Sequence, residues 1–97
     1  MIVEIQCLPT PPGTDDEPYA HVERAIAEIQ DSGLRYEVGA LGTTVEGDPD
    51  VVWPLLRRVH ETCVRSAALS VVTIIKVAQG SGAAHDPHID DLVSTFR

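Results

Sequence analysis

Apolar residues recur along this chain with two different periods. Residues 2–8 alternate apolar and polar side chains, a period of two that is typical of a half-buried strand. Residues 18–31 carry apolar side chains three and four positions apart, which predicts a helix that ends at Gly33. Residues 34–47 return to an extended pattern, and the glycine-rich stretch at 39–42 predicts a hairpin turn between two short strands.

A helix and then a strand follow again in the second half. Apolar residues from Val52 to Cys63 form a helical stripe, which predicts a helix that ends near Ser66. We place Pro54 within the first turn of this helix, where proline is tolerated. The β-branched run at 69–77 then predicts a fourth strand.

The end of the chain has a different composition. Residues 79–84 are rich in Gly, Ser and Ala and read as a linker, and residues 85–97 predict a short terminal helix. We therefore expect one domain over residues 1–78, followed by a linker and C-terminal tail or short helix over 79–97.

The element order βαββαβ predicts an α+β fold of the ferredoxin-like type, a four-stranded antiparallel sheet with two helices on one face. The fourth strand, however, is apolar on both faces, with Val71 and Ile75 on one side and Val72 and Ile74 on the other. Helices on one face cannot bury both sides. We therefore expect a second copy of the chain to cover the other face, in a homodimer or homotetramer.

The composition of the chain argues against two classes of partner, nucleic acids and membranes. The 97 residues carry 7 Lys and Arg against 15 Asp and Glu, a net charge of −8, which argues against a nucleic-acid binder. No segment approaches the roughly 20 apolar residues that span a bilayer, so we expect no membrane partner and a cytoplasmic location. Cys7 and Cys63 fall at apolar positions and are expected as buried thiols without a disulfide.

Polar side chains interrupt two of the predicted strands. Thr43, Thr44 and Glu46 lie in one strand, and Thr73 and Lys76 lie in the β-branched run. Buried polar groups are either paired within the protein or available to a ligand. Two alternatives stand for Glu46 and Lys76, a cross-strand or intersubunit salt bridge and contact with a ligand. Threonines also occur in strands for propensity alone.

Four short motifs resemble one family in order and spacing. They are Met1-Ile2-Val3-Glu4-Ile5, Gly33-Leu34 with Tyr36, Gly42-Thr43-Thr44-Val45-Glu46-Gly47-Asp48 and Val71-Val72-Thr73-Ile74-Ile75-Lys76. Together, over residues 1–77, they resemble the YkoF-like thiamine-binding family of small ferredoxin-like proteins. The resemblance implies a homo-oligomer that binds thiamine or its hydroxymethylpyrimidine portion without catalysis. The chain departs from the family pattern at Val77-Ala78-Gln79, where an acidic residue is usual, and in a longer proline-rich loop at 9–18.

Thiamine combines a cationic thiazolium ring with an aminopyrimidine, so a receptor needs an aromatic ring or carboxylate and paired donors and acceptors. Glu46 is a candidate acceptor for the amino group, and Thr43 or Thr44 a candidate for the ring edge. Tyr36 or Trp53 is a candidate for stacking, although both are also common core or interface residues. The ligand-binding set is thus Tyr36, Thr43, Thr44, Glu46, Thr73 and Lys76.

Other chemistry has weaker signals. His85 and His88 follow the linker with a spacing that matches no strong metal motif, and a solvated tail is the preferred interpretation. His21 and His60 are expected to be structural. We assign no catalytic residue, no metal ligand and no cofactor, and we expect a binding protein that is not an enzyme. The alternative function is a structural or regulatory oligomeric module that senses another small molecule or an anion.

Overall fold

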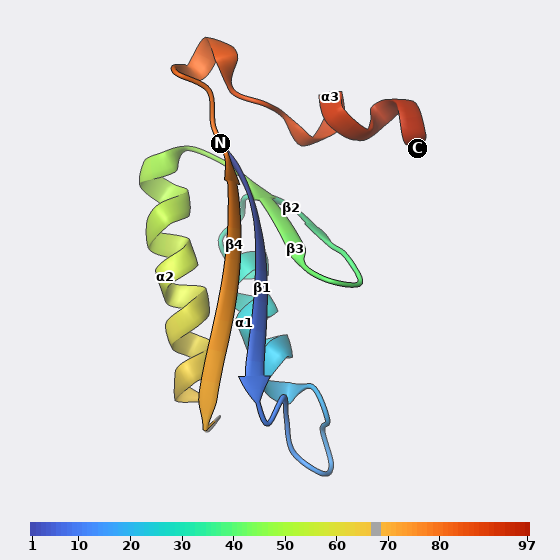
Figure 1. Cartoon of the computed structure of the whole chain (residues 1–97), viewed down its shortest axis with the longest axis vertical. Coiled ribbons are helices and arrows are strands. Elements are labelled where there is room, and N and C mark those ends of the chain that lie inside the picture. The colour runs from blue at the N-terminus through green and yellow to red at the C-terminus, as the bar shows by residue number, and fades with distance from the viewer. Residues whose placement is uncertain (67–68) are drawn as a thin grey trace.

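The computed structural model describes residues 1–66 and 69–97, and its strands form one antiparallel sheet. The strands are β1 (Ile2–Thr10), β2 (Arg35–Val38), β3 (Thr43–Glu46) and β4 (Ser70–Ala78). They are ordered β2-β3-β1-β4, and every neighbouring pair is antiparallel (Figure 1). This order, with a helix after β1 and another after β3, confirms the expected ferredoxin-like α+β fold.

Two helices cover one face of the sheet. The first, α1 (Ala20–Asp31), is followed by Gly33, whose φ of 75° is a left-handed conformation that glycine adopts without a Cβ clash. The second, α2 (Pro49–Arg65), begins after Asp48, whose carboxylate accepts a hydrogen bond from the Asp50 N–H at 2.8 Å. The end of α1 at Gly33 and the start of α2 at Asp48 therefore agree with the prediction from the sequence.

The predicted place of Pro54 is wrong. Because α2 starts at Pro49, Pro54 lies inside the helix and beyond its first turn. Proline lacks an N–H, so the carbonyl of Asp50, four residues earlier, has no helical donor. Asp50 and Pro54 are both exposed, and water can therefore hydrogen-bond that carbonyl.

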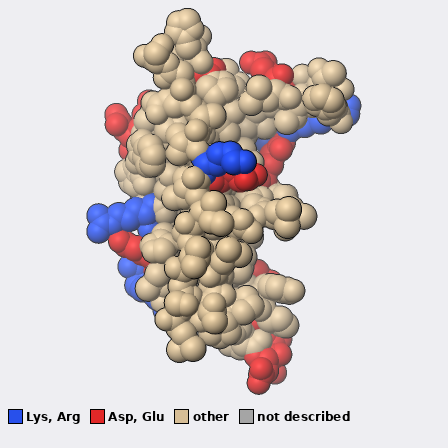
Figure 2. All heavy atoms as spheres, in the orientation of Figure 1, with Lys and Arg blue, Asp and Glu red and all other residues tan. Residues whose placement is uncertain are grey.

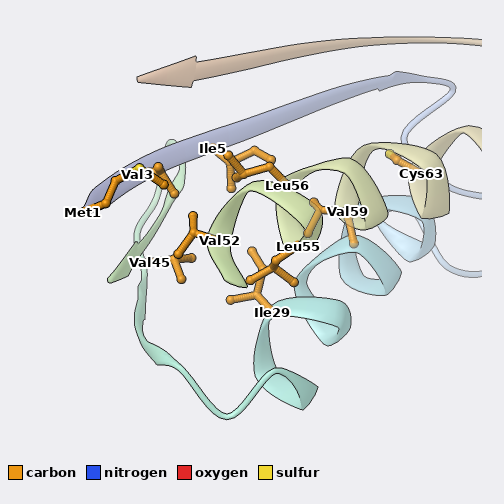
Figure 3. Packing of buried hydrophobic residues seen from close by; sticks show 11 residues of the cluster. Met1, Val3, Ile5, Ile29, Val45, Val52, Leu55, Leu56, Val59 and Cys63 are labelled. Carbon is orange, nitrogen blue, oxygen red and sulfur yellow. The ribbon is translucent and has the colours of Figure 1, made fainter. Parts of the chain in front are cut away.

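The core lies between the helices and the sheet (Figure 3). The strands contribute alternate residues, such as Val3 and Ile5 of β1, and the helices contribute residues three and four positions apart. The largest fully buried side chains come from both layers and are Ile29, Leu55, Val3, Val45, Val52, Val59 and Cys63. The apolar residues of the strands and those of the helices, which recur with different periods in the sequence, thus pack together in one core.

On the second face of the sheet, no helix of the described residues lies over β1 and β4, and we call it the open face. Leu8, Val72 and Ile74 lie there with 43%, 59% and 52% of their surface exposed. Figure 2 shows this side of the molecule, where charged side chains gather mainly around the rim. The charged residues of these two strands, Glu4 and Lys76, are cross-strand neighbours. A single chain therefore exposes an apolar surface over β1 and β4.

The C-terminal segment lies near the start of β1, at the end of the open face formed by β2 and β3. It contains η1 (Ala83–His85), α3 (Ile89–Val93) and η2 (Ser94–Phe96), which confirms the predicted short helix (Figure 1). Ile89 is buried, and its N–H donates to the Glu46 carboxylate at 2.6 Å. Asp90 pairs with Arg35 at 2.8 Å, and Arg97 pairs with Glu37. The tail is thus held against β2 and β3 by side chains of the open face.

No helix in the part of the chain that the structure describes is both long enough and apolar enough to cross a membrane.

Candidate functional site

The sheet leaves half of β1 with a strand on one side only. β3 pairs with β1 from Ile2 to Ile5, and the last pair joins Ile5 to Thr43. β4 pairs with β1 along its whole length, as far as Thr10. In the described chain, β1 therefore extends from Gln6 to Thr10 beyond the end of the β2–β3 hairpin (Figure 1). The early turn at 39–42 is the cause, because it makes β3 only four residues long.

A cavity of about 480 Å³ opens beside this free edge. One wall is β1 from Ile5 to Thr10, and the facing wall is an apolar stripe of α1. The β2–β3 turn and the start of β3 close a third side, with Leu41 and Thr43 among their residues. The α1 stripe consists of Val22, Ala25, Ile26 and Ile29. A space of this size, largely apolar and bounded by three elements, is typical of a small-molecule site.

Polar groups in the lining are few and uncharged. The side chains are those of Gln6, Cys7, Thr10, Tyr19 and Thr43. Within residues 1–66 and 69–97, no Asp, Glu, Lys, Arg or His lines the cavity. Thr43 is 4% exposed, and its hydroxyl has no hydrogen-bond partner among the described residues. Among the described residues no fully buried side-chain polar atom lacks a partner, so this hydroxyl retains some accessible surface, and Thr43 lines the cavity. It can therefore donate to or accept from a ligand.

The loop after β1 is anchored at the cavity by His21. Its ring nitrogen Nδ1 lies 2.9 Å from the Pro11 carbonyl oxygen, and its backbone N–H donates to the Pro12 carbonyl at 3.0 Å. These bonds hold the loop against the start of α1, where Pro12 and Tyr19 line the cavity. His21 is buried and bonded within the protein, which confirms its structural role.

The two cysteines are free thiols. Cys63 is buried as expected, whereas Cys7 is only partly buried and lines the cavity. The Thr73 hydroxyl donates to the Cys7 Sγ at 3.8 Å, and the Cys63 Sγ donates to the His21 carbonyl at 3.8 Å. Burial raises the pKa of the Cys7 thiol, and it raises the pKa of Cys63 to about 11. Both thiols are therefore protonated at neutral pH, and a protonated thiol is a poor nucleophile.

The six residues predicted as ligand contacts divide between the two faces of the sheet. Those on the helix-covered face are Tyr36, Thr43 and Thr73. Those on the open face are Thr44, Glu46 and Lys76. Thr43 alone of the six lines the large cavity. Within one chain the six residues thus lie on two faces of the sheet, and their contacts with a ligand stay a prediction.

Three of these residues already have protein partners. Tyr36 packs against the core, and the Thr73 hydroxyl lies 2.6 Å from Nδ1 of His60, a structural role for that histidine. The Glu46 carboxylate accepts from the Ile89 N–H and lies 3.5 Å from His88 Nδ1. Trp53 is half-exposed on α2 and does not line the cavity.

A cross-strand salt bridge between Glu46 and Lys76 within one chain is contradicted by the sheet register, whereas a bridge between subunits stays a prediction. In the sheet register Glu46 lies opposite Ile2 and Arg35, whereas Lys76 lies opposite Glu4. β1 separates the two strands, so Glu4 is the acidic neighbour of Lys76. The sequence correctly placed both residues on one face, but it carried no information on the pairing between strands.

A second hollow, of about 410 Å³, lies between the tail and the β3–α2 turn. Its acidic residues are Glu46, Asp48 and Asp86, and His88 is beside them. Asp86 accepts from the Gly80 N–H at 2.9 Å, which keeps the pKa of its carboxyl below the ordinary value. Among the described residues no three His, Cys, Asp or Glu side chains are grouped to hold a metal ion.

Sequence reasoning missed most of the cavity. Gln6, Thr10 and Tyr19 line it, yet none stood out as a polar residue within an apolar strand. One signal was available, because the strand pattern around Thr43–Glu46 is much shorter than the pattern that begins at Ile2. Adjacent strands of unequal length leave an unpaired edge, and such an edge invites a ligand or another strand.

Comparison with known proteins gives a consistent result. The family model described as thiamine-binding protein matches residues 3–96. A UPF0045 protein of Clostridium perfringens is 30% identical over 95 residues, which cover 98% of this chain and 95% of that protein.

Solved structures agree with the sequence match. A domain of unknown function, DUF77, from Bacillus cereus superposes with a TM-score of 0.84 at 33% identity, covering 99% of this chain and 88% of the other. A protein of Thermotoga maritima, described as a putative thiamine biosynthesis/salvage protein, has a TM-score of 0.80 at 26% identity and covers 99% and 97%. With the family match over nearly its whole length, the chain belongs to the thiamine-binding protein family.

Proposed function

We propose that this protein binds thiamine or its hydroxymethylpyrimidine portion in the cavity between β1 and α1. The observation that carries the proposal is a neutral, largely apolar cavity of about 480 Å³ in a chain of the thiamine-binding family. A flat heteroaromatic ring suits such a space, because apolar walls take its faces and a few polar groups orient its edge.

Individual groups in the lining match parts of the ligand. Ile26, Ile29 and Leu41 offer apolar contacts to a pyrimidine, and the Thr43 hydroxyl offers a donor or an acceptor. Tyr19 is 64% exposed and supplies an aromatic ring for a cation such as thiazolium. The net charge of −8 also favours a cationic ligand over an anionic one.

The lining gives no support to the alternative of an anion sensor. Anions are held by basic side chains, and the cavity lining contains none. Phosphate esters of thiamine should therefore bind at least about tenfold more weakly than thiamine itself, since a phosphate would lose water without gaining a cation.

We also propose that the protein acts without catalysis, in the cytoplasm and as a homo-oligomer. Both thiols have a raised pKa, so neither is an activated nucleophile, and free thiols suit a reducing compartment. The open face exposes Leu8, Val72 and Ile74, and a second copy could bury them. Thr44, Glu46 and Lys76 would then contact or flank that interface.

Isothermal titration with thiamine, hydroxymethylpyrimidine and thiamine phosphate tests the ligand, and sedimentation of the same sample gives the oligomer. We expect saturable binding of the first two, with a dissociation constant in the micromolar range or tighter. A bound ligand at about 100 times its dissociation constant should add about 2.7 kcal/mol to the free energy of unfolding. A folded protein that gives no heat with either compound would overturn the ligand assignment.

A further inference from the structure

The direction of the backbone groups of β1 can be read from its hydrogen bonds. The Met1 amino group donates to the Gly47 carbonyl at 3.2 Å, and the Gly47 N–H donates to the Met1 carbonyl at 3.0 Å. Met1 thus points its backbone groups towards the β3 side. In an antiparallel strand alternate residues point to the same side, so Val3 and Ile5 also face β3.

The same alternation continues past the end of β3. The register between β1 and β4 runs without a bulge from Ile2 to Thr10. The backbone groups of Cys7 and Pro9 therefore point to the same side of the strand as those of Ile5. Two observations agree with this. The Thr10 carbonyl accepts from the Leu69 N–H at 2.6 Å, on the β4 side. Proline at position 9 is tolerated because it has no N–H and needs no partner on an open edge.

Cys7 therefore presents both its N–H and its carbonyl to the cavity, and Pro9 presents a carbonyl alone. Neither backbone group of Cys7 has a hydrogen-bond partner in the described part of the chain. An unpaired backbone donor and acceptor at a cavity wall must be satisfied by water or by a ligand. Cys7 also lines the cavity, which brings this pair within reach of a bound molecule.

We infer that the backbone N–H and carbonyl of Cys7 recognise the edge of an aminopyrimidine. The inference rests on the proposed function and names the group that selects the ligand. In an extended residue the N–H and the carbonyl point the same way and lie side by side. A ring nitrogen next to an amino group offers the complementary acceptor and donor. Cys7 would thus bind this ring edge as it would bind a neighbouring strand.

Proline at position 7 tests the inference, because it removes the N–H while the strand stays extended. Cys7→Ala is the matched control, since it also lacks the thiol but keeps the N–H. We expect Cys7→Pro to bind hydroxymethylpyrimidine at least about tenfold more weakly than Cys7→Ala. The two melting temperatures should agree within about 4 °C, because the lost N–H has no protein partner. Leu8→Pro removes an N–H that faces β4 and should lower the melting temperature by more than about 10 °C.

A measurement on the unmodified chain covers the case in which Cys7→Pro does not fold. The Cys7 amide resonance should shift downfield with hydroxymethylpyrimidine, and it should shift much less with the analogue that lacks the amino group. Two results would overturn this inference and leave the proposed function intact, provided that the unmodified chain binds. One is equal affinity of Cys7→Pro and Cys7→Ala, and the other is a Cys7 amide resonance that does not shift. Absence of binding by the unmodified chain would overturn both.

Discussion

The two faces of the sheet use the same alternating pattern for different purposes. On the helix-covered face, Val3 and Val45 are completely buried against α1 and α2. On the open face, Val72 and Ile74 of β4 are more than half exposed, while the C-terminal segment contacts β2 and β3. The comparison shows that an apolar position in a strand predicts burial only when the fold supplies a layer to cover it.

The cavity lies where the covered face is incomplete. β1 continues past β3, so α1 faces a free strand edge and the turn at Leu41 instead of a complete sheet. The open face, by contrast, exposes Leu8, Val72 and Ile74 over β1 and β4 and suits a broad partner. The two faces therefore differ in the kind of partner that we propose for each, a small molecule for one and a second copy of the chain for the other.

The largest difference between the faces should appear in stability. Leu55 is completely buried, and Leu55→Ala should lower the free energy of unfolding by about 2–5 kcal/mol through lost burial and a residual cavity. Val72→Ala on the open face should cost less than about 1 kcal/mol within a single chain, since the side chain is already 59% exposed. Denaturant unfolding of the diluted, monomeric protein measures both, and equal losses would contradict the contrast.

Charge on the open face should act on assembly. Ile74→Glu places a carboxylate at the centre of the proposed interface and should raise the dissociation constant of the oligomer at least about a hundredfold, or ~3 kcal/mol. Lys76→Glu, at the next open-face position of β4, shows whether added negative charge alone is sufficient. Sedimentation over a range of concentrations measures the change, and an Ile74→Glu oligomer as tight as the original would remove this face as the interface.

Neighbouring threonines allow a direct comparison of the faces in ligand binding. Thr43 lines the cavity and Thr44 lies on the open face. Thr43→Val keeps the shape and removes the hydroxyl, which should weaken hydroxymethylpyrimidine binding about fivefold, or ~1 kcal/mol. Thr44→Val should change the affinity less than twofold. Titration of both variants decides the matter, and the reverse order would return the ligand to the open face.

The smallest effect is expected at the tail. Glu46→Gln weakens the acceptor for the Ile89 N–H and removes the charge beside His88, at a cost of about 0.5–1 kcal/mol. Glu37→Gln, which loses only exposed pairs, should cost less still. Hydrogen exchange should show faster exchange at Ile89 in Glu46→Gln, with the core amides of β1 unchanged. Unchanged exchange at Ile89 would mean that the tail is held mainly by burial of its side chain.

The sequence by itself determined the element order, the residues of the core between helices and sheet, and the family. Periods of two and of 3.6 are local properties, so Val3 and Val45 could be assigned to strands and Val52, Leu55 and Val59 to a helix without knowledge of the fold. The short motifs around Thr43 and Thr73 likewise supported the family that the comparison confirms.

Only the tertiary structure decided how the strands pair and what that pairing leaves open. Alternation fixes the face on which a residue lies but not its neighbour across the sheet. A cross-strand bridge between Glu46 and Lys76 was therefore an open alternative in the sequence, although β1 lies between the two strands. The free edge at Cys7 depends on the relative lengths of β1 and β3 and on the position of α1 beside them. These are contacts between residues far apart in the chain, and no local pattern encodes them.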